Sequence, residues 1–449
     1  MSHRINRRHA ALAPLAWLGT AGLAGCTAAT QTMISTAPTI DHVPWSRNAA
    51  IYEVNIRQFT PEGTLAAFEA HLPRLAQMGV GILWLMPIQP IGAKNRKGRL
   101  GSYYSIADYT AVNPEFGTLA DFQRMVAGAH ALGMKVILDW VANHTAWDHP
   151  WVVQHRQRYK LDAQGEVFAV TFRAGTPDVE YWTDVVGLDY AEPSLWPAMT
   201  DAMAYWLREA DIDGFRCDVA SLVPTPFWEQ ARAALNRIKP VFMLAESDAV
   251  DLHAEAFDMT YDWDLHDQLR AIAKGRADAR ALRDWWQRRQ AKYPADAYRM
   301  NFTGNHDSNS WHGSDSEFYG EVDCFKAMAV LAATLPGMPL IYGGQESFYA
   351  KRLQFFERDL IDWRGYPLAG FYAELLVLKT KHAALAHGQA GGSPQWVDTG
   401  NDQVLVFERR QGTDAVRVAV NLGPQAQAWR GMDGETGSLA PWSWRIVVR

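Results

Sequence analysis

One stretch of the sequence decides how the rest is interpreted: Ile212-Asp213-Gly214-Phe215-Arg216-Cys217-Asp218-Val219-Ala220. Its apolar start, its glycine and its closely spaced arginine and aspartate are typical of a strand that ends in functional groups. Side chains alternate along a strand, so Arg216 and Asp218 should face the same side. A neighbouring arginine lowers the pKa of a carboxyl group, which would keep Asp218 ionised as a nucleophile or charge stabiliser. An ordinary ion pair at a strand end would give the same local pattern.

Three further stretches favour the functional interpretation. Each is an apolar, strand-like run that ends in carboxylate, histidine or amide groups. They are Val136-Ile137-Leu138-Asp139 with Asn143-His144, Val241 to Glu246, and Phe302 to His306-Asp307. Four such runs in one chain indicate a shared site rather than unrelated ion pairs.

Apolar strand-like runs alternate with longer helical patterns from Ala50 onward, which is typical of repeated βα units. Helical patterns lie between most of the strands, for example over Leu65–Met78. The sequence predicts eight strands, Ile51–Ile56, Gly81–Met86, Lys135–Trp140, Ile212–Asp218, Val241–Glu246, Phe257–Asp262, Arg299–Gly304 and Met338–Gly343. Eight strand–helix units predict an α/β fold, the closed (β/α)8 TIM barrel, in which one unit averages about 31 residues.

The spacing of the carboxylates agrees with a barrel. Asp218 and Glu246 lie 28 positions apart, which is one unit, and Glu246 and Asp307 lie 61 apart, which is two. Asp139 and Asp218 lie 79 apart, so we expect a short insertion at about 145–190 after the third strand. A loop over 88–116 carries a basic run from Lys94 to Arg99, which we interpret as solvated.

The pattern changes after Leu385. Three short alternating runs separated by glycine- and aspartate-containing turns predict antiparallel strands. We therefore assign residues 45–385 to the catalytic barrel and residues 386–449 to a C-terminal β-sandwich domain.

The N-terminus predicts export. Three arginines within the first eight residues precede an apolar run that ends in Leu23-Ala24-Gly25-Cys26. Such a run is too short to span a membrane durably and is typical of a signal segment. The ending resembles the bacterial lipoprotein signal, which implies a lipid anchor on Cys26 at the periplasmic or cell-surface side. Thr27 in place of an aspartate would favour the outer membrane of a two-membrane bacterium. The alternative is a plain signal peptide.

Residues 1–26 are therefore assigned to the signal segment and residues 27–44 to a flexible tether rich in Thr, Ala, Ser and Pro. The chain of 449 residues is 48% hydrophobic and its net charge of −6 is dispersed, so we expect no nucleic-acid partner. We expect a monomer that contacts a membrane only through the anchor. Cys217 and Cys324, which remain after Cys26, are interpreted as buried packing thiols.

Active sites of parallel barrels form at the C-terminal ends of the strands. Asp218, Glu246 and Asp307 close the fourth, fifth and seventh predicted strands, so they should converge on one mouth. Three carboxylates facing one another are costly, which argues against a purely structural role. Glycoside hydrolysis uses such a set, with one ionised carboxylate as nucleophile and one protonated carboxyl group as acid.

These stretches resemble the signature regions of the alpha-amylase family of glycoside hydrolases. The resemblance extends over about residues 45–449 and its motifs occur in the family order. The matching stretches are Tyr104 to Tyr109 with Phe116-Gly117-Thr118, Asp139 to His144, Gly214 to Asp218, Glu246 after strand five, Asn305-His306-Asp307, and Tyr342 to Glu346.

The resemblance implies a retaining hydrolase of α-linked glucans or malto-oligosaccharides. It makes Asp218 the nucleophile, Glu246 the general acid/base and Asp307 the stabiliser of the oxocarbenium-like transition state. It implies that four further residues bind the sugar at the cleavage point, with the first stacking beneath it: Tyr104, His144, Arg216 and His306.

The chain departs from the family at one position that concerns metal binding. Many calcium-dependent members carry Lys-His three and four residues after the nucleophile, where this chain has Ser221-Leu222. Oxygen ligands from the insertion could still bind calcium. The sequence does not support a calcium site, however, and we expect no cofactor. Val219 occurs in relatives that act on α-1,6 bonds, so the preferred linkage stays open.

Two alternatives remain within this interpretation. A transglycosylase or glucan isomerase would use the same carboxylates but transfer the glycosyl group to another sugar. A non-catalytic relative would bind glucan without cleaving it. The presence of Asp218, Glu246 and Asp307 together favours an enzyme.

Overall fold

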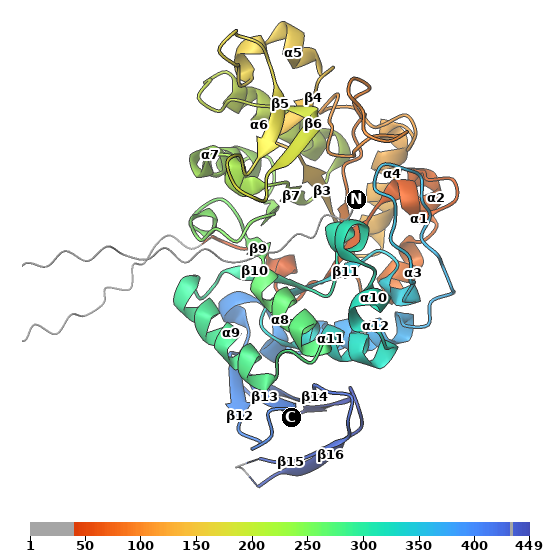
Figure 1. Ribbon diagram of the computed structural model, residues 1–449, viewed down its shortest axis with the longest axis vertical. Helices are drawn as coiled ribbons and strands as arrows, with labels where there is room; N and C mark the ends of the chain where they lie inside the picture. The colour runs from red at the N-terminus through yellow and green to blue at the C-terminus, as the bar shows by residue number, and fades with distance from the viewer. Residues whose placement is uncertain (1–39, 432–433) are drawn as a thin grey trace, which may run out of the picture.

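The structure is a computed structural model that describes residues 40–431 and 434–449 (Figure 1). Eight parallel strands close into a barrel in the order β1-β11-β10-β9-β8-β7-β3-β2. Their bounds are β1 (Ile51–Val54), β2 (Ile82–Leu85), β3 (Lys135–Trp140), β7 (Gly214–Cys217), β8 (Phe242–Ala245), β9 (Met259–Tyr261), β10 (Tyr298–Phe302) and β11 (Met338–Tyr342). The predicted TIM barrel is confirmed, since each strand overlaps the run predicted for it.

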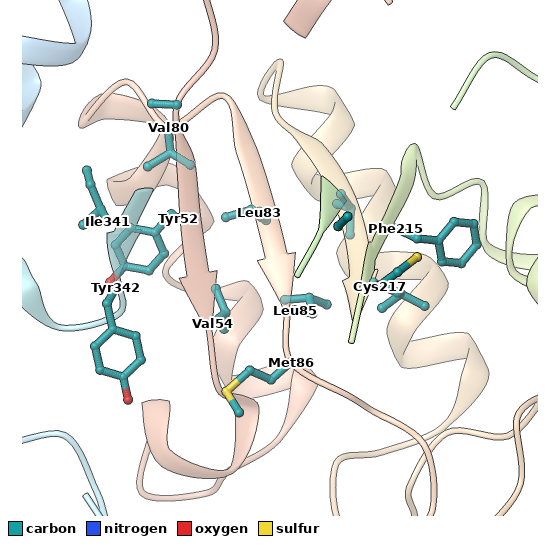
Figure 2. Packing of buried hydrophobic residues seen from close by; sticks show 14 of the residues in the cluster. Tyr52, Val54, Val80, Leu83, Leu85, Met86, Phe215, Cys217, Ile341 and Tyr342 are labelled. Carbon is teal, nitrogen blue, oxygen red and sulfur yellow. The ribbon is translucent and has the colours of Figure 1, made fainter. Parts of the chain in front are cut away.

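The barrel strands are buried on both faces, as parallel strands covered by helices must be. Side chains that point inward, such as Ile51, Ile82 and Ile137, form one apolar cluster. Side chains that point outward pack under the helices, and Figure 2 shows Val54 and Leu85 side by side on neighbouring strands. Cys217 and Cys324 are free and buried, which confirms that they are packing thiols.

Helices cover the outside of the barrel. Their bounds are α1 (Ile56–Phe59), α2 (Leu65–Glu69), α3 (Leu72–Gln77), α4 (Leu119–Ala131), α5 (Pro150–Gln154), α6 (Leu195–Ala210), α7 (Thr225–Asn236), α8 (Trp263–Ala273), α9 (Ala279–Lys292), α10 (Asp315–Tyr319), α11 (Val322–Thr334) and α12 (Ala369–Lys381). The single helix predicted over Leu65–Met78 is wrong, because α2 ends before Ala70 and Pro73 lies in the first turn of α3. Proline has no backbone N–H and is tolerated only near a helix start.

The segment between β3 and α6 forms a small antiparallel sheet of its own. It consists of β4 (His144–Ala146), β6 (Glu180–Gly187) and β5 (Ala169–Phe172), in that order. Figure 1 shows this insertion sheet at the end of the molecule opposite the C-terminal strands. The sequence indicated an insertion here but not its strands.

The C-terminal region contains two antiparallel sheets. One is β12 (Pro394–Val397), β13 (Val404–Gln411), β14 (Asp414–Asn421) and β17 (Trp444–Val448), and the other is β15 (Gln427–Arg430) with β16 (Thr436–Leu439). Alternate residues of β13 face different partners, as strand geometry requires. Val404 and Val406 pack against Trp429 of the second sheet, whereas Leu405 and Phe407 join the main core.

The described chain enters the fold at the N-terminal ends of the barrel strands. Val43 packs in the same cluster as the barrel interior, and Trp45 contacts Phe242, the first residue of β8. His42 Nδ1 lies 2.8 Å from an Asp258 carboxylate oxygen and its ring stacks on Tyr298. The sequence predicts a tether up to residue 44, but His42 and Val43 are already buried, because His42 packs on Tyr298 and Val43 joins the interior cluster.

The predicted signal segment, the lipid anchor at Cys26 and most of the predicted tether lie outside the described residues. Among the helices of residues 40–431 and 434–449, none is long and apolar enough to cross a membrane.

Candidate active site

The three predicted catalytic carboxylates follow the C-terminal ends of barrel strands. Asp218 comes directly after β7 and Glu246 directly after β8, and backbone hydrogen bonds to Trp140 and Cys217 continue the strand ladder to both. Asp307 lies five residues beyond the end of β10. The backbone pairing of β7 with β8 is therefore enough to place Asp218 beside Glu246, independently of any side-chain contact.

Arg216 lies at the centre of the site. Its Nη1 is 2.9 Å from Asp139 Oδ1 and 3.1 Å from Asp218 Oδ1. Its Nη2 is 3.0 Å from Glu246 Oε2. The sequence suggested an ion pair between Arg216 and Asp218 alone, whereas the structure shows one buried guanidinium shared by three carboxylates.

This sharing reverses the expected direction of the pKa shift of Asp218. Burial and the Glu246 carboxylate raise the pKa of Asp218, and Arg216 lowers it without offsetting them. Burial also raises the pKa of Asp139 to about 6, against the opposing effect of Arg216. One positive charge cannot neutralise three carboxylates in a low-dielectric site, so the cluster favours keeping a proton. That proton belongs to the coupled group rather than to one residue.

Val219 links the nucleophile position to the acid position. Its backbone N–H donates to Glu246 Oε2 over 2.8 Å. Its φ of 37° is in the left-handed region, which a β-branched residue rarely adopts. Such strain persists where the surroundings hold it in place and is common at functional sites. Here it aims an amide at the carboxyl group of Glu246.

His306 connects Asp307 to the barrel interior. Its Nε2 lies 3.5 Å from Asp307 Oδ1 and 2.9 Å from the Tyr104 hydroxyl, and its Nδ1 contacts Glu53. Burial alone would lower the pKa of His306, but Asp307 and Glu53 raise it to about 9. The imidazole is therefore a cation near neutral pH, and both ring nitrogens donate.

Tyr104 holds a fixed orientation through this network. Its hydroxyl donates to Asp139 Oδ2 over 3.1 Å and accepts from His306 Nε2. Its ring stacks at 21° on the His306 ring. The predicted sugar-stacking residue thus lies against the predicted binding histidine and beside the cluster around Arg216.

His144 differs from His306 in charge. Burial lowers the pKa of His144 to about 3, so the ring is neutral. Its Nδ1 lies 3.1 Å from Asn143 Nδ2, and its ring meets Trp182 of β6 edge to face. His144 therefore places a neutral imidazole where β3 leads into the insertion sheet.

Three residues of the site were missed from the sequence. Glu53 lies within β1 and is fully buried. Trp84 donates through its indole nitrogen to Asp139 Oδ2, and the Tyr261 hydroxyl accepts from Arg216 Nε. A carboxylate inside the apolar run Ile51–Val54 was the one signal that could have revealed Glu53.

The basic loop is largely exposed, as predicted, and two of its side chains also form ion pairs with distant segments. Lys97 pairs with the buried Asp184 of β6 over 3.0 Å. Arg99 Nε lies 3.3 Å from a carboxylate oxygen of Glu357, in the segment after β11. The sequence did not predict these two ion pairs, because both carboxylates come from segments distant in sequence.

The described residues contain no cluster of the side chains that most often hold metal ions. Within the described parts of the chain, no group of three or more His, Cys, Asp or Glu side chains could hold a metal ion. Backbone oxygens near Asn143 are already paired, because Tyr109 donates to the carbonyls of Val141 and His144 and Tyr190 donates to that of Ala142. The expectation that no cofactor is needed stays a prediction.

Comparison with known proteins agrees with this geometry. The model of the alpha amylase catalytic domain matches residues 31–174 and 180–362. An alpha-amylase of Haloarcula japonica is 29% identical over 406 residues, covering 86% of this chain and 57% of that protein. An alpha-1,4-glucan:maltose-1-phosphate maltosyltransferase of Rhodospirillum rubrum is 30% identical and is covered to 57%. This chain thus spans little more than half the length of these two relatives.

A solved structure gives a fuller match. The crystal structure of an alpha-amylase from Lactobacillus plantarum superposes with a TM-score of 0.80 at 30% identity. The match covers 90% of this chain and 99% of that one.

Proposed function

Because this chain belongs to the alpha-amylase family, we propose that it is a retaining hydrolase of α-linked glucans and malto-oligosaccharides. The observation that carries the proposal is the arrangement around Arg216, which brings Asp218 and Glu246 to adjacent strand ends under one guanidinium. A retaining enzyme needs its two carboxyl groups close together, because one of them attacks the sugar directly and no water molecule lies between them.

In the first step, Asp218 attacks the anomeric carbon while Glu246 gives its proton to the glycosidic oxygen. The bond between that carbon and oxygen breaks, and a glycosyl ester of Asp218 forms. In the second step, Glu246 takes a proton from water, the water oxygen bonds to the anomeric carbon, and Asp218 leaves as a carboxylate.

The remaining groups bind the sugar, and Asp307 stabilises the positive charge that develops on it. Asp307 is the most exposed of the three carboxylates, with 41% of its side chain accessible, so it can approach the ring. We propose that His306 and Arg216 also bind the sugar at the cleavage point and that Tyr104 stacks beneath it. Such preorganised charge is worth most where water is excluded.

The stereochemistry of the first product tests the mechanism. Hydrolysis of maltotriose followed by NMR should give α-configured reducing ends before mutarotation. First products with β configuration would exclude double displacement. A product profile on starch, pullulan, maltotriose and isomaltose would then define the linkage.

Transfer to another sugar is the second candidate, and one comparison favours it. The maltosyltransferase of Rhodospirillum rubrum is as similar to this chain as the alpha-amylases are. Both reactions pass through the same glycosyl ester and differ only in whether water or a hydroxyl of a sugar attacks. Incubation with maltotetraose separates them, since a transferase gives products longer than the substrate.

We also propose that the protein is an exported lipoprotein, held at a membrane through Cys26, and that it acts as a monomer. The Leu23-Ala24-Gly25-Cys26 ending supports the anchor. The position of His42 and Trp45 at the N-terminal ends of the strands supports an arrangement in which the mouth points away from the membrane. A single chain supplies all the candidate site residues, which supports a monomer; size-exclusion chromatography tests it.

A further inference from the structure

A cluster of aromatic rings extends outward from Tyr104 at the mouth of the barrel. Phe355 stacks on Tyr104 with ring centroids 6.1 Å apart and planes at 9°. Trp311 lies 5.5 Å from Phe355, and Phe356 lies within 6 Å of both. We name Trp311, Phe355 and Phe356 the aromatic platform.

The platform grows directly from the candidate site. Trp311 belongs to the short helical segment Ser308–His312, which begins right after Asp307. Phe355 lies in the segment that follows β11, and its ring also contacts the His306 ring. A sugar bound at Tyr104 would therefore have the platform as its neighbour.

Exposure sets Trp311 apart from the tryptophans of the core. Its side chain is 52% exposed, whereas Trp84, Trp140 and Trp206 are fully buried. Leaving a large apolar ring in water forgoes the free energy of its burial. An exposed aromatic surface next to a candidate site is typical of a ligand-binding surface.

Hydrogen bonds hold the platform in place. Asn309 donates to the Lys351 carbonyl over 3.1 Å and accepts from the Leu353 backbone N–H over 2.8 Å, so it ties the two segments together. The basic loop secures the other side, since the Leu100 N–H donates to the Phe356 carbonyl over 3.1 Å. Rings fixed before binding lose little entropy when a ligand arrives.

We propose that the aromatic platform is a subsite that stacks a glucosyl ring of the substrate chain beyond the ring bound at Tyr104, and so favours longer glucans. The apolar face of a pyranose matches an exposed indole, while its rim of hydroxyls stays in water. This inference rests on the proposed function, because it names the chain length that the same site prefers.

Two variants and one control test the subsite by kinetics. Trp311→Ala should lower the ratio of kcat/KM on maltoheptaose to that on maltotriose by about tenfold, the effect of losing one aromatic contact. Trp311→Tyr keeps a flat ring and should restore most of the ratio. Phe168→Ala removes a ring of comparable exposure (42%) from the insertion and should leave the ratio unchanged.

A binding measurement separates failure of the subsite from failure of the proposed function. Calorimetry with maltoheptaose in an Asp218→Asn background needs no turnover, and adding Trp311→Ala should weaken binding by a similar factor. Equal affinity with and without Trp311 would overturn the subsite. A kinetic ratio that rises in Trp311→Ala would also overturn it, since the ring would then obstruct long chains. A wild-type protein without glucan hydrolysis would contradict the function alone.

Discussion

At the level of single residues, the site depends on how one guanidinium is divided among Asp139, Asp218 and Glu246. Removing the negative charge of Asp218 relieves a repulsion that burial makes costly, so stability should not fall with activity. The same change removes the atom that attacks the sugar. Substitution of Asp218 should therefore lower activity without lowering stability.

We expect Asp218→Asn to lower kcat by several orders of magnitude, as loss of a covalent nucleophile does in other enzymes. The thermal unfolding midpoint should be equal to or above that of the wild type, since a buried charge has been removed. Initial rates on maltotriose and calorimetric melting measure the two effects. A variant that keeps more than about a tenth of the wild-type rate would exclude Asp218 as the nucleophile.

His306 should make stability depend on pH. Its pKa is raised from 6.5 to about 9 in the folded protein, so the folded state binds the proton more tightly than the unfolded state. The resulting stabilisation is fully present below pH 6.5 and is lost as pH rises through about 9. We therefore expect His306→Gln to be destabilising at about pH 6 and nearly neutral at about pH 10. Urea unfolding of both proteins at the two pH values checks this, and an equal difference at both would contradict it.

The sequence revealed residues that lie in recognisable local patterns. Asp218, Glu246 and Asp307 end apolar runs at the spacing of barrel units, so their convergence followed from the fold. Glu53 was missed because it meets His306 only when β1 pairs with β11 and β11 with β10, which closes the barrel. The direction of the pKa shift of Asp218 could not be predicted from the sequence either. It depends on how many carboxylates share Arg216, and this number is known only once the barrel strands are assembled.

At the level of elements, one buried arginine adds to the apolar contacts that join the C-terminal sheet to the barrel. Arg409 of β13 is 1% exposed and donates to the carbonyls of Gly392, Thr334 and Ala386 over 2.7 to 3.0 Å. The carbonyl of Thr334 is among those that α11 leaves unpaired at its C-terminus. This arginine therefore satisfies a helix end and fixes the sheet to it.

We expect Arg409→Met to lower the free energy of unfolding by about 3 kcal/mol or more, because it leaves three buried carbonyls without donors. Arg410→Met is the matched control: the neighbouring arginine is about half exposed and pairs with Glu408, which Arg449 also faces. It should cost less than about 1 kcal/mol. Chemical denaturation measures both, and similar losses in the two variants would show that the carbonyl contacts of Arg409 contribute little.

The elements also show where the sequence was insufficient. The barrel strands were predictable because burial on both faces makes each a continuous apolar run. The insertion strands were not, since β5 is only half-buried and its pairing with β6 shifts register at Ala169/Val170. The two ion pairs of the basic loop were not predicted because its partners, Asp184 and Glu357, are distant in sequence.

At the level of the whole molecule, the two ends of the barrel have different roles. The mouth with Asp218 lies at the C-terminal ends of the strands, and the chain enters at the N-terminal ends through His42 and Trp45. A protein tethered at its N-terminus would thus hold its mouth away from the surface that carries it. Such an orientation suits a substrate that is itself a long chain.

The anchor predicted at Cys26 gives the last test. Stable membrane attachment requires more than one lipid chain, as in the lipoprotein modification that this ending resembles. We expect the wild-type protein to sediment with membranes and Cys26→Ala to remain in the soluble fraction with the same activity on maltotriose, since the substitution lies far in sequence from the barrel. Fractionation of cells that express each protein, followed by an activity assay of both fractions, measures this. Identical partition of both proteins into the soluble fraction would show that the segment is an ordinary signal peptide. The basic head and apolar run would then still predict export. The inferred orientation of the mouth away from a membrane would no longer apply, because the protein would not be attached to one.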